Sequence, residues 1–289
     1  MLNLNKQGNK IIELYHKDKF NTDYKLDKDA KPDKILYLNN NEINKNESII
    51  INDLDDYIPF PYLDPKERQT FYISGCSGSY KTTTACNLIN LFIQHNKDIF
   101  ILYFTGINEI DDSLNNYLKI VCKNNCMVIN TKTFINAKLN KLILPCSVEY
   151  INWFQKNKKN VPFLVIMDDV ESMSNKIIRN QLLEFQTQIL RLGRCHSKQT
   201  KHINLITIQH STLNYQQSRV LLQECKYSVF NLRAVSKSTI INLLQIKYGF
   251  DSDIINYILQ LKKEGGQITF FSSAFPYLIF NNKSIILEN

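Results

Sequence analysis

The stretch from residue 70 to residue 94 constrains the fold of this chain more than any other. It reads TFYISGCSGSYKTTTACNLINLFIQ: a short apolar run, then a bend rich in glycine and serine, then a helical pattern. Apolar residues in that last part recur every three or four positions, as they do in an amphipathic helix. A strand, a tight bend and a helix in this order are typical of a loop that binds phosphate, because small residues let the backbone curl closely around an anion.

The bend is a near match to the motif G-x-x-x-x-G-K-[ST]. We expect Lys81 to reach the β- and γ-phosphates of a nucleotide and the hydroxyl of Thr82 to bind Mg²⁺. Tyr80 stands where the motif has its second glycine, and a positive φ at that position would cost a tyrosine roughly 1–2 kcal/mol. A plain turn between a strand and a helix is the alternative interpretation. The residues predicted to contact the nucleotide are Gly75, Cys76, Ser77, Gly78, Ser79, Tyr80, Lys81, Thr82 and Thr83.

A second signal lies at residues 162–171, which read PFLVIMDDVE. This pattern predicts a buried strand with Asp168 and Asp169 at its carboxyl end, where open α/β sheets place their ligands. A solvated turn after a buried strand is the alternative. A GTPase is not favoured, because the residues after Asp168 lack the glycine of D-x-x-G, and residues 130–133 lack the aspartate of N-K-x-D.

Strand-like and helical patterns alternate from residue 69 onward, which predicts an α/β fold with a mostly parallel central sheet flanked by helices. Residues 1–65 are rich in Asn, Asp and Lys and are expected to form an N-terminal extension that is partly β. Residues 66–250 are expected to form the core. A helix and a small β hairpin are expected in residues 251–289.

Composition limits the partners and the compartment. The net charge of +8 favours an anionic partner. The first 20 residues carry charges throughout, so no signal peptide is expected, and the apolar runs are too short to span a bilayer. The seven cysteines include no C-x-x-C pair, which indicates reduced thiols in an intracellular protein that is not secreted.

Two further features follow the acidic strand. A basic segment at residues 191–202 contains Arg191 and Arg194, and a strand pattern at residues 203–209 ends in the polar residue Gln209. Together with the loop before Lys81 and the Asp168 strand, these elements resemble, in order and type, the genome-packaging ATPases of large double-stranded DNA viruses. Those enzymes belong to the FtsK/HerA superfamily of ring-shaped DNA motors, and the resemblance covers roughly residues 66–250.

The resemblance implies a RecA-like P-loop NTPase that binds ATP and Mg²⁺ and assembles into a homo-oligomeric ring. The implied partners are double-stranded DNA and a capsid vertex or portal-like component. The implied location is the host cytoplasm or a viral factory, with association to the virion as an option. The implied function is ATP-driven packaging of a viral genome.

Specific roles carry over to matching positions. Asp168 matches the acid that holds Mg²⁺, and Asp169 falls where the family keeps an acid that orients or deprotonates the attacking water. Gln209 matches the polar residue that senses the γ-phosphate. Arg194 resembles an arginine that contacts nucleotide across a subunit boundary, with Arg191 as the other candidate. Two other functions stay open: a P-loop nucleoside or nucleotide kinase, and an assembly protein that binds nucleotide but hydrolyses it poorly because of Tyr80.

Overall fold

The computed structural model describes residues 2–4, 8–38, 49–52, 54, 56–105, 112–122, 125–130, 132–135, 146–157, 160–193, 201–210, 215–264, 268–273 and 277–288. The chain divides into two compact units that alternate along the sequence. Unit 1 comprises Met1–Tyr62, Ser74–Lys81 and Ser211–Asn289, and unit 2 comprises Leu63–Ile73 and Thr82–His210. The three-part division at residues 65 and 250 stays a prediction.

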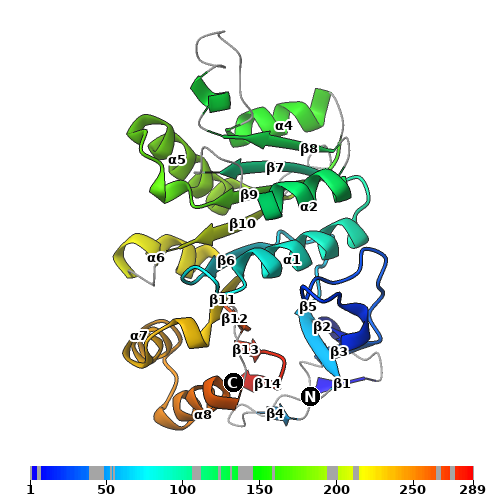
Figure 1. Cartoon of the computed structure of the whole chain (residues 1–289), viewed down its shortest axis with the longest axis vertical. Coiled ribbons are helices and arrows are strands. Elements are labelled where there is room, and N and C mark those ends of the chain that lie inside the picture. The colour runs from blue at the N-terminus through cyan, green and yellow to red at the C-terminus, as the bar shows by residue number, and fades with distance from the viewer. Residues whose placement is uncertain are drawn as a thin grey trace. The chain divides into compact units, whose positions relative to one another are not determined.

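Unit 2 contains the parallel sheet that the sequence predicted. Its strands follow the order β6-β10-β9-β7-β8, which can be followed side by side in Figure 1. Strand β9 pairs in parallel with β10 on one side and with β7 on the other, and β7 pairs in parallel with β8. The bounds are β6 (Thr70–Ser74), β7 (Phe100–Thr105), β8 (Cys126–Ile129), β9 (Phe163–Asp168) and β10 (Ile203–Gln209).

Predominantly apolar sequence explains why the middle strands form the core of unit 2. Every residue of β9 and of β10 is buried, as expected for a parallel sheet that is covered on both faces. The helices of this part of the chain are α1 (Lys81–His95), α2 (Asp112–Cys122), α4 (Val148–Asn157) and α5 (Lys176–Leu192), and the short 3₁₀ helix η3 (Val170–Ser172) follows β9.

Helix α5 shows how local signals set its ends. The side chain of Asn175 accepts hydrogen bonds from the N–H groups of Ile177 and Ile178, which is the usual role of an N-cap asparagine. At the other end, the guanidinium group of Arg68 donates to the carbonyl oxygens of Ile189 and Leu190, at 2.7 and 2.5 Å. Both sets of backbone groups that a helix leaves without intrahelical partners are thus partly satisfied.

Unit 1 is built on antiparallel strands. One sheet has the order β1-β3-β2-β5, and its strands are β1 (Leu2–Asn3), β2 (Asn9–His16), β3 (Lys34–Leu38) and β5 (Tyr57–Pro61). The other strands of unit 1 follow the order β4-β14-β13-β12-β11, with β4 (Ile49–Asn52), β11 (Tyr227–Asn231), β12 (Ile268–Ser272), β13 (Tyr277–Phe280) and β14 (Ser284–Glu288). The predicted C-terminal hairpin is confirmed as β13 and β14, which pair in antiparallel register.

The α-helices of unit 1 that the structure describes lie in its C-terminal part. They are α6 (Tyr215–Glu224), α7 (Lys237–Leu243) and α8 (Ser252–Glu264), and α7 continues into a one-turn π-helix, η5 (Leu244–Tyr248). The short 3₁₀ helices are η1 (Lys17–Lys19) and η4 (Leu232–Ala234).

Aromatic side chains link the N-terminal strands of unit 1 to its C-terminal strands. Phe60 of β5 packs edge-on against Phe270 of β12, with 6.2 Å between ring centroids. Phe270 in turn stacks on Phe280 of β13 at 4.8 Å. The N-terminal extension therefore contributes to an apolar core instead of remaining a solvated tail.

Within the part of the chain that the structure describes, no helix combines the length and the apolar character that crossing a membrane requires.

Candidate functional site

The stretch from β6 to α1 has the strand, bend and helix in the order that the sequence predicted. Strand β6 ends at Ser74 and helix α1 begins at Lys81, so residues 75–80 form the bend. Gly78 has φ = 76° and Tyr80 has φ = 60°, so both adopt the left-handed conformation. This conformation strains a tyrosine by roughly 1–2 kcal/mol, whereas glycine adopts it without strain.

The inside of the bend has no room for a side chain at Gly75. A Cβ atom built there would lie 2.4 Å from Oγ of Ser79, closer than real Cβ contacts allow. The Ser79 hydroxyl is itself buried and has no hydrogen-bond partner among the residues that the structure describes. A buried hydroxyl without a partner is costly unless a ligand completes its hydrogen bonding.

Lys81 points its ammonium group back across the bend. Its Nζ donates to the carbonyl oxygen of Cys76 at 2.7 Å, and the side chain is 6% exposed. The amide of Asn231 also donates to the Ser79 carbonyl at 3.2 Å and so restrains the bend. A cation, a buried hydroxyl without a partner among the described residues and a tight, glycine-containing turn fit a phosphate group chemically.

Thr82 and Thr83 follow in the first turn of α1, and both are partly exposed. A hydroxyl oxygen from Thr82 together with a carboxylate oxygen from Asp168 matches the oxygen ligands that Mg²⁺ prefers. Both residues belong to unit 2. Among the residues that the structure describes, no three side chains of His, Cys, Asp or Glu form a group that would hold a metal ion by themselves.

The acidic end of β9 lies where the sequence placed it. Asp168 is the last residue of the strand and is 5% exposed. The hydroxyl of Tyr103 on β7 donates to its carboxylate at 3.1 Å, and Thr105 and Ile208 are its register partners on the two neighbouring strands. The parallel register therefore brings three strand ends together: Thr105, Asp168 and Gln209.

Asp169 leaves the strand with an unusual backbone. Its φ is 52°, again in the left-handed region, and its carboxylate accepts a hydrogen bond from the Ser172 hydroxyl at 2.8 Å. Its backbone N–H donates to the carbonyl oxygen of Ile208, which continues the pairing of β9 with β10 by one residue. The side chain proposed to act on water is thus held by a local hydrogen bond.

Glu171 is a member of this acidic group that sequence reasoning did not single out. Burial, together with the nearby charges of Asp169 and Asp168, raises the pKa of its carboxyl group to about 7. Its Oε1 atom is buried without a hydrogen-bond partner in the described part of the chain. The signal was an acid three residues after Asp168, but the burial that gives it significance comes only with the folded structure.

The raised pKa predicts a pH-dependent stability that Glu171→Gln removes. The folded state binds the Glu171 proton more tightly than the unfolded chain does, because the pKa of this carboxyl group is near 4.5 in the unfolded chain. The stabilisation is therefore fully present below about pH 4.5 and is lost as the pH rises through about 7. Glutamine stays neutral, so the variant should be more stable than the wild type at pH 8, by an amount on the order of 3 kcal/mol at most.

Urea unfolding of the metal-free protein, followed by circular dichroism, measures this difference. The midpoints of the two proteins should converge near pH 4.5 and separate at pH 8. A Glu171→Gln midpoint that stays below the wild-type value at pH 8 would contradict the raised pKa.

Of the two candidate arginines, only Arg191 lies among the residues that the structure describes. Arg191 lies in the last turn of α5 and is exposed, so its guanidinium group is accessible. Arg194 lies outside the described residues.

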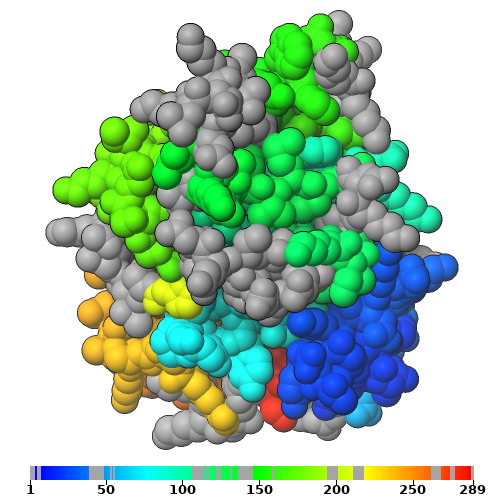
Figure 2. All heavy atoms as spheres, turned by 45° about the horizontal axis from the view of Figure 1, so that its top comes forward, coloured from blue at the N-terminus to red at the C-terminus, as the bar shows by residue number. Residues whose placement is uncertain are grey.

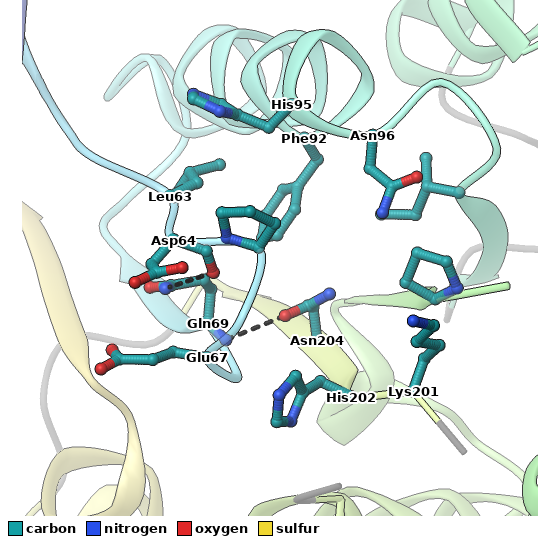
Figure 3. A pocket seen from close by; sticks show the side chains of 13 residues that line it. Leu63, Asp64, Glu67, Gln69, Phe92, His95, Asn96, Lys201, His202 and Asn204 are labelled. Carbon is teal, nitrogen blue, oxygen red and sulfur yellow. Dashed lines mark hydrogen bonds between the residues drawn. The ribbon is translucent and has the colours of Figure 1, made fainter. Parts of the chain in front are cut away.

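A separate pocket of about 170 Å³ lies in unit 2, at the opposite ends of the strands. Figure 3 shows Gln69, which precedes β6, between Asp64 and Asn204. The backbone N–H of Gln69 donates to Oδ1 of Asn204 at 2.9 Å. Pro162 precedes β9 and also lines this pocket. The pocket therefore belongs to the amino ends of these strands, away from Asp168 and Gln209.

No protein-family model and no curated protein matches the chain. Solved structures with some likeness include an uncharacterised protein from Pyrococcus horikoshii in complex with an unknown peptide (10% identity, 57% of this chain and 77% of that one, TM-score 0.34). Another is the cytoplasmic domain of the type VII secretion ATPase EccC from Thermomonospora curvata (13% identity, 90% of this chain and 30% of that one, TM-score 0.43). A third is the type III secretion ATPase EscN from enteropathogenic E. coli, assembled with its central stalk EscO (12% identity, 60% of this chain and 42% of that one, TM-score 0.31). This chain spans less than half of the EccC and EscN chains.

Proposed function

We propose that this protein binds ATP with Mg²⁺ and hydrolyses it. The observation that carries the proposal is the bend before Lys81, which brings together a buried lysine, two left-handed residues and a buried hydroxyl without a hydrogen-bond partner among the described residues. Backbone N–H groups at the start of α1 add the positive end of the helix dipole.

Each predicted residue then has a defined task. Lys81 neutralises charge on the β- and γ-phosphates, and the residues from Gly75 to Thr83 hold the phosphate chain through their backbone. Thr82 and Asp168 hold the magnesium ion, which supplies charge neutralisation at the phosphates. The Tyr103 hydroxyl orients the Asp168 carboxylate through the hydrogen bond at 3.1 Å.

Other residues serve the water and the γ-phosphate. Asp169 orients the attacking water, and Gln209 contacts the γ-phosphate from the end of β10. An arginine from a neighbouring copy, Arg191 or Arg194, adds positive charge in the transition state, which is worth ~10³-fold or more in phosphoryl transfer. Supply of that arginine in trans couples hydrolysis to assembly of a homo-oligomeric ring.

We further propose that hydrolysis drives translocation of double-stranded DNA, to package a viral genome through a capsid vertex or portal-like component. The order of the phosphate loop, acidic strand, basic segment and Gln209 supports this proposal through its resemblance to viral packaging ATPases. The net charge of +8 is consistent with a polyanionic partner.

Phosphate release from radiolabelled ATP tests both proposals, ATP hydrolysis and its coupling to DNA translocation. Release that double-stranded DNA stimulates supports a DNA translocase, and release without stimulation supports an ATPase of another kind. Transfer of the label to an added nucleoside or nucleotide would indicate a kinase instead. Binding without release would indicate a hydrolysis-poor assembly protein, an alternative favoured by the Ser172 bond to Asp169 and the strained Tyr80.

Replacing Tyr80 by glycine should keep or raise ATP turnover. Glycine adopts φ = 60° without the penalty that tyrosine pays, so the bend keeps its shape in the variant. Steady-state phosphate release measures the effect, which should be between no change and a gain of about tenfold, because roughly 1–2 kcal/mol of strain is removed. Loss of nucleotide binding in Tyr80→Gly would show that the loop holds phosphate in another way.

A further inference from the structure

Two tyrosines in unit 1 share an uncommon backbone conformation. Tyr80 in the phosphate loop has φ = 60°, and Tyr24 in the N-terminal segment has φ = 58°. Bulky residues adopt this conformation rarely, and it persists only where surrounding structure holds it. The cause at each position therefore has to be sought in the residue's neighbours.

One neighbour of each tyrosine is the other tyrosine. The rings of Tyr24 and Tyr80 meet edge to face, with 6.3 Å between centroids and an interplanar angle of 83°. This is the favoured geometry for an aromatic pair. The rings remain 63% and 47% exposed, so the contact lies at the surface. Figure 2 shows the N-terminal segment as blue atoms on the surface.

The turn that carries Tyr24 is preorganised. Oδ1 of Asn21 accepts hydrogen bonds from the N–H groups of Asp23 and Lys25, both at 3.0 Å. The backbone N–H of Tyr24 donates to the carbonyl oxygen of Asn21 at 2.9 Å, which closes the turn. An asparagine that bonds its own backbone in this way fixes a turn without help from distant residues.

The turn is also anchored to the sheet of unit 1. The residues flanking it, Phe20 and Leu26, form an isolated β-bridge, and Leu26 is buried. The ring of Phe20 stacks on Phe60 of β5, at 6.1 Å and 18°. The turn that carries Tyr24 is therefore held in place by the sheet. Because Tyr24 cannot move freely, its contact with Tyr80 restrains the phosphate loop.

We propose that Tyr24 is a positioning residue for the phosphate loop: by packing against Tyr80, it holds the loop in its phosphate-binding conformation and lets the N-terminal segment set the affinity for nucleotide. The proposal rests on the proposed nucleotide-binding function. It accounts for two features at once, the tyrosine at a position where the motif has glycine and a task for the N-terminal segment. Tyr24 contacts the loop and acts on the nucleotide only through Tyr80.

A double-mutant cycle on the full-length protein tests this coupling. The dissociation constant of a fluorescent ATP analogue with Mg²⁺ is measured for the wild type, Tyr24→Ala, Tyr80→Gly and the double variant. Tyr24→Ala should weaken binding about threefold to tenfold, the range expected for loss of one aromatic pair. In the Tyr80→Gly background the same change should have no effect, because glycine needs no support there.

Two controls separate positioning from general destabilisation. Tyr24→Phe keeps the aromatic ring and should bind the ATP analogue with wild-type affinity. Thr22→Ala removes an exposed side chain from the same turn and should leave affinity unchanged. Equal losses from Tyr24→Ala in both backgrounds, or no loss in the wild-type background, would overturn the proposal. A wild-type protein that binds no nucleotide would instead overturn the proposed function on which this inference rests.

Discussion

Lys81→Ala is expected to weaken nucleotide binding by about 10- to 100-fold and to reduce ATP turnover further, to a level on the order of 10²- to 10³-fold below the wild type. Lys81 is buried in the bend and donates to the Cys76 carbonyl, so its ammonium group is already held where phosphate oxygens would approach. Alanine removes the only side-chain cation within residues 74–81. Hydrogen bonds from a cation to phosphate are among the strongest in proteins.

Titration with a fluorescent ATP analogue measures the affinity, and phosphate release measures the turnover. Lys97→Ala is the matched control, because Lys97 is exposed just beyond α1 and has no role in the proposed site. The control should bind nucleotide as the wild type does. A Lys81→Ala protein with affinity within twofold of the wild type would show that the bend is a plain structural turn.

Phe104→Ala is expected to destabilise the protein by about 3–5 kcal/mol. Phe104 lies in β7, is fully buried, and packs against Phe134 and Phe185 with ring centroids 6.3 and 5.8 Å away. Removing the ring leaves a cavity between the sheet and these two partners, which the close-packed surroundings cannot fill.

Urea unfolding followed by circular dichroism measures the loss as a lower midpoint. Ile177→Ala is the control, since this side chain at the start of α5 is 70% exposed and its removal should change the free energy of unfolding by no more than about 0.5 kcal/mol. Equal midpoints for the two variants would contradict the packing of Phe104.

The α/β architecture was predictable from short-range patterns. The apolar runs before Thr105 and Asp168, and the largely apolar run before Gln209, became the strands β7, β9 and β10, because strands with apolar side chains on both faces have to be covered on both sides. The bend before Lys81 was also predictable from a short-range pattern, because its small residues and the lysine follow one another directly in the sequence. The roles assigned to the nucleotide-contacting residues, to Asp169 and Gln209, and to the two arginines remain proposals.

The N-terminal segment was harder to interpret. Its composition of Asn, Asp and Lys gives weak strand signals, yet β2, β3 and β5 form a sheet with a buried interior that includes Ile12, Tyr15 and Phe60. Glu13 is buried there as well, and it accepts a hydrogen bond from the Tyr15 hydroxyl at 2.7 Å. Burial, together with the Glu13 charge, raises the pKa of Tyr15. A buried acid paired with a tyrosine leaves no trace in a pattern of apolar residues.

The sequence alone determined the strand–bend–helix unit around Lys81 and the acid pair that ends a buried strand, because each depends on residues next to one another in the chain. Only the tertiary structure decided that Tyr103 bonds to Asp168 from 65 positions away, that the Oε1 atom of Glu171 is buried, and that Tyr24 meets Tyr80. Those contacts arise when packing of the apolar cores brings distant polar and aromatic side chains together, and no local pattern encodes which of them will meet.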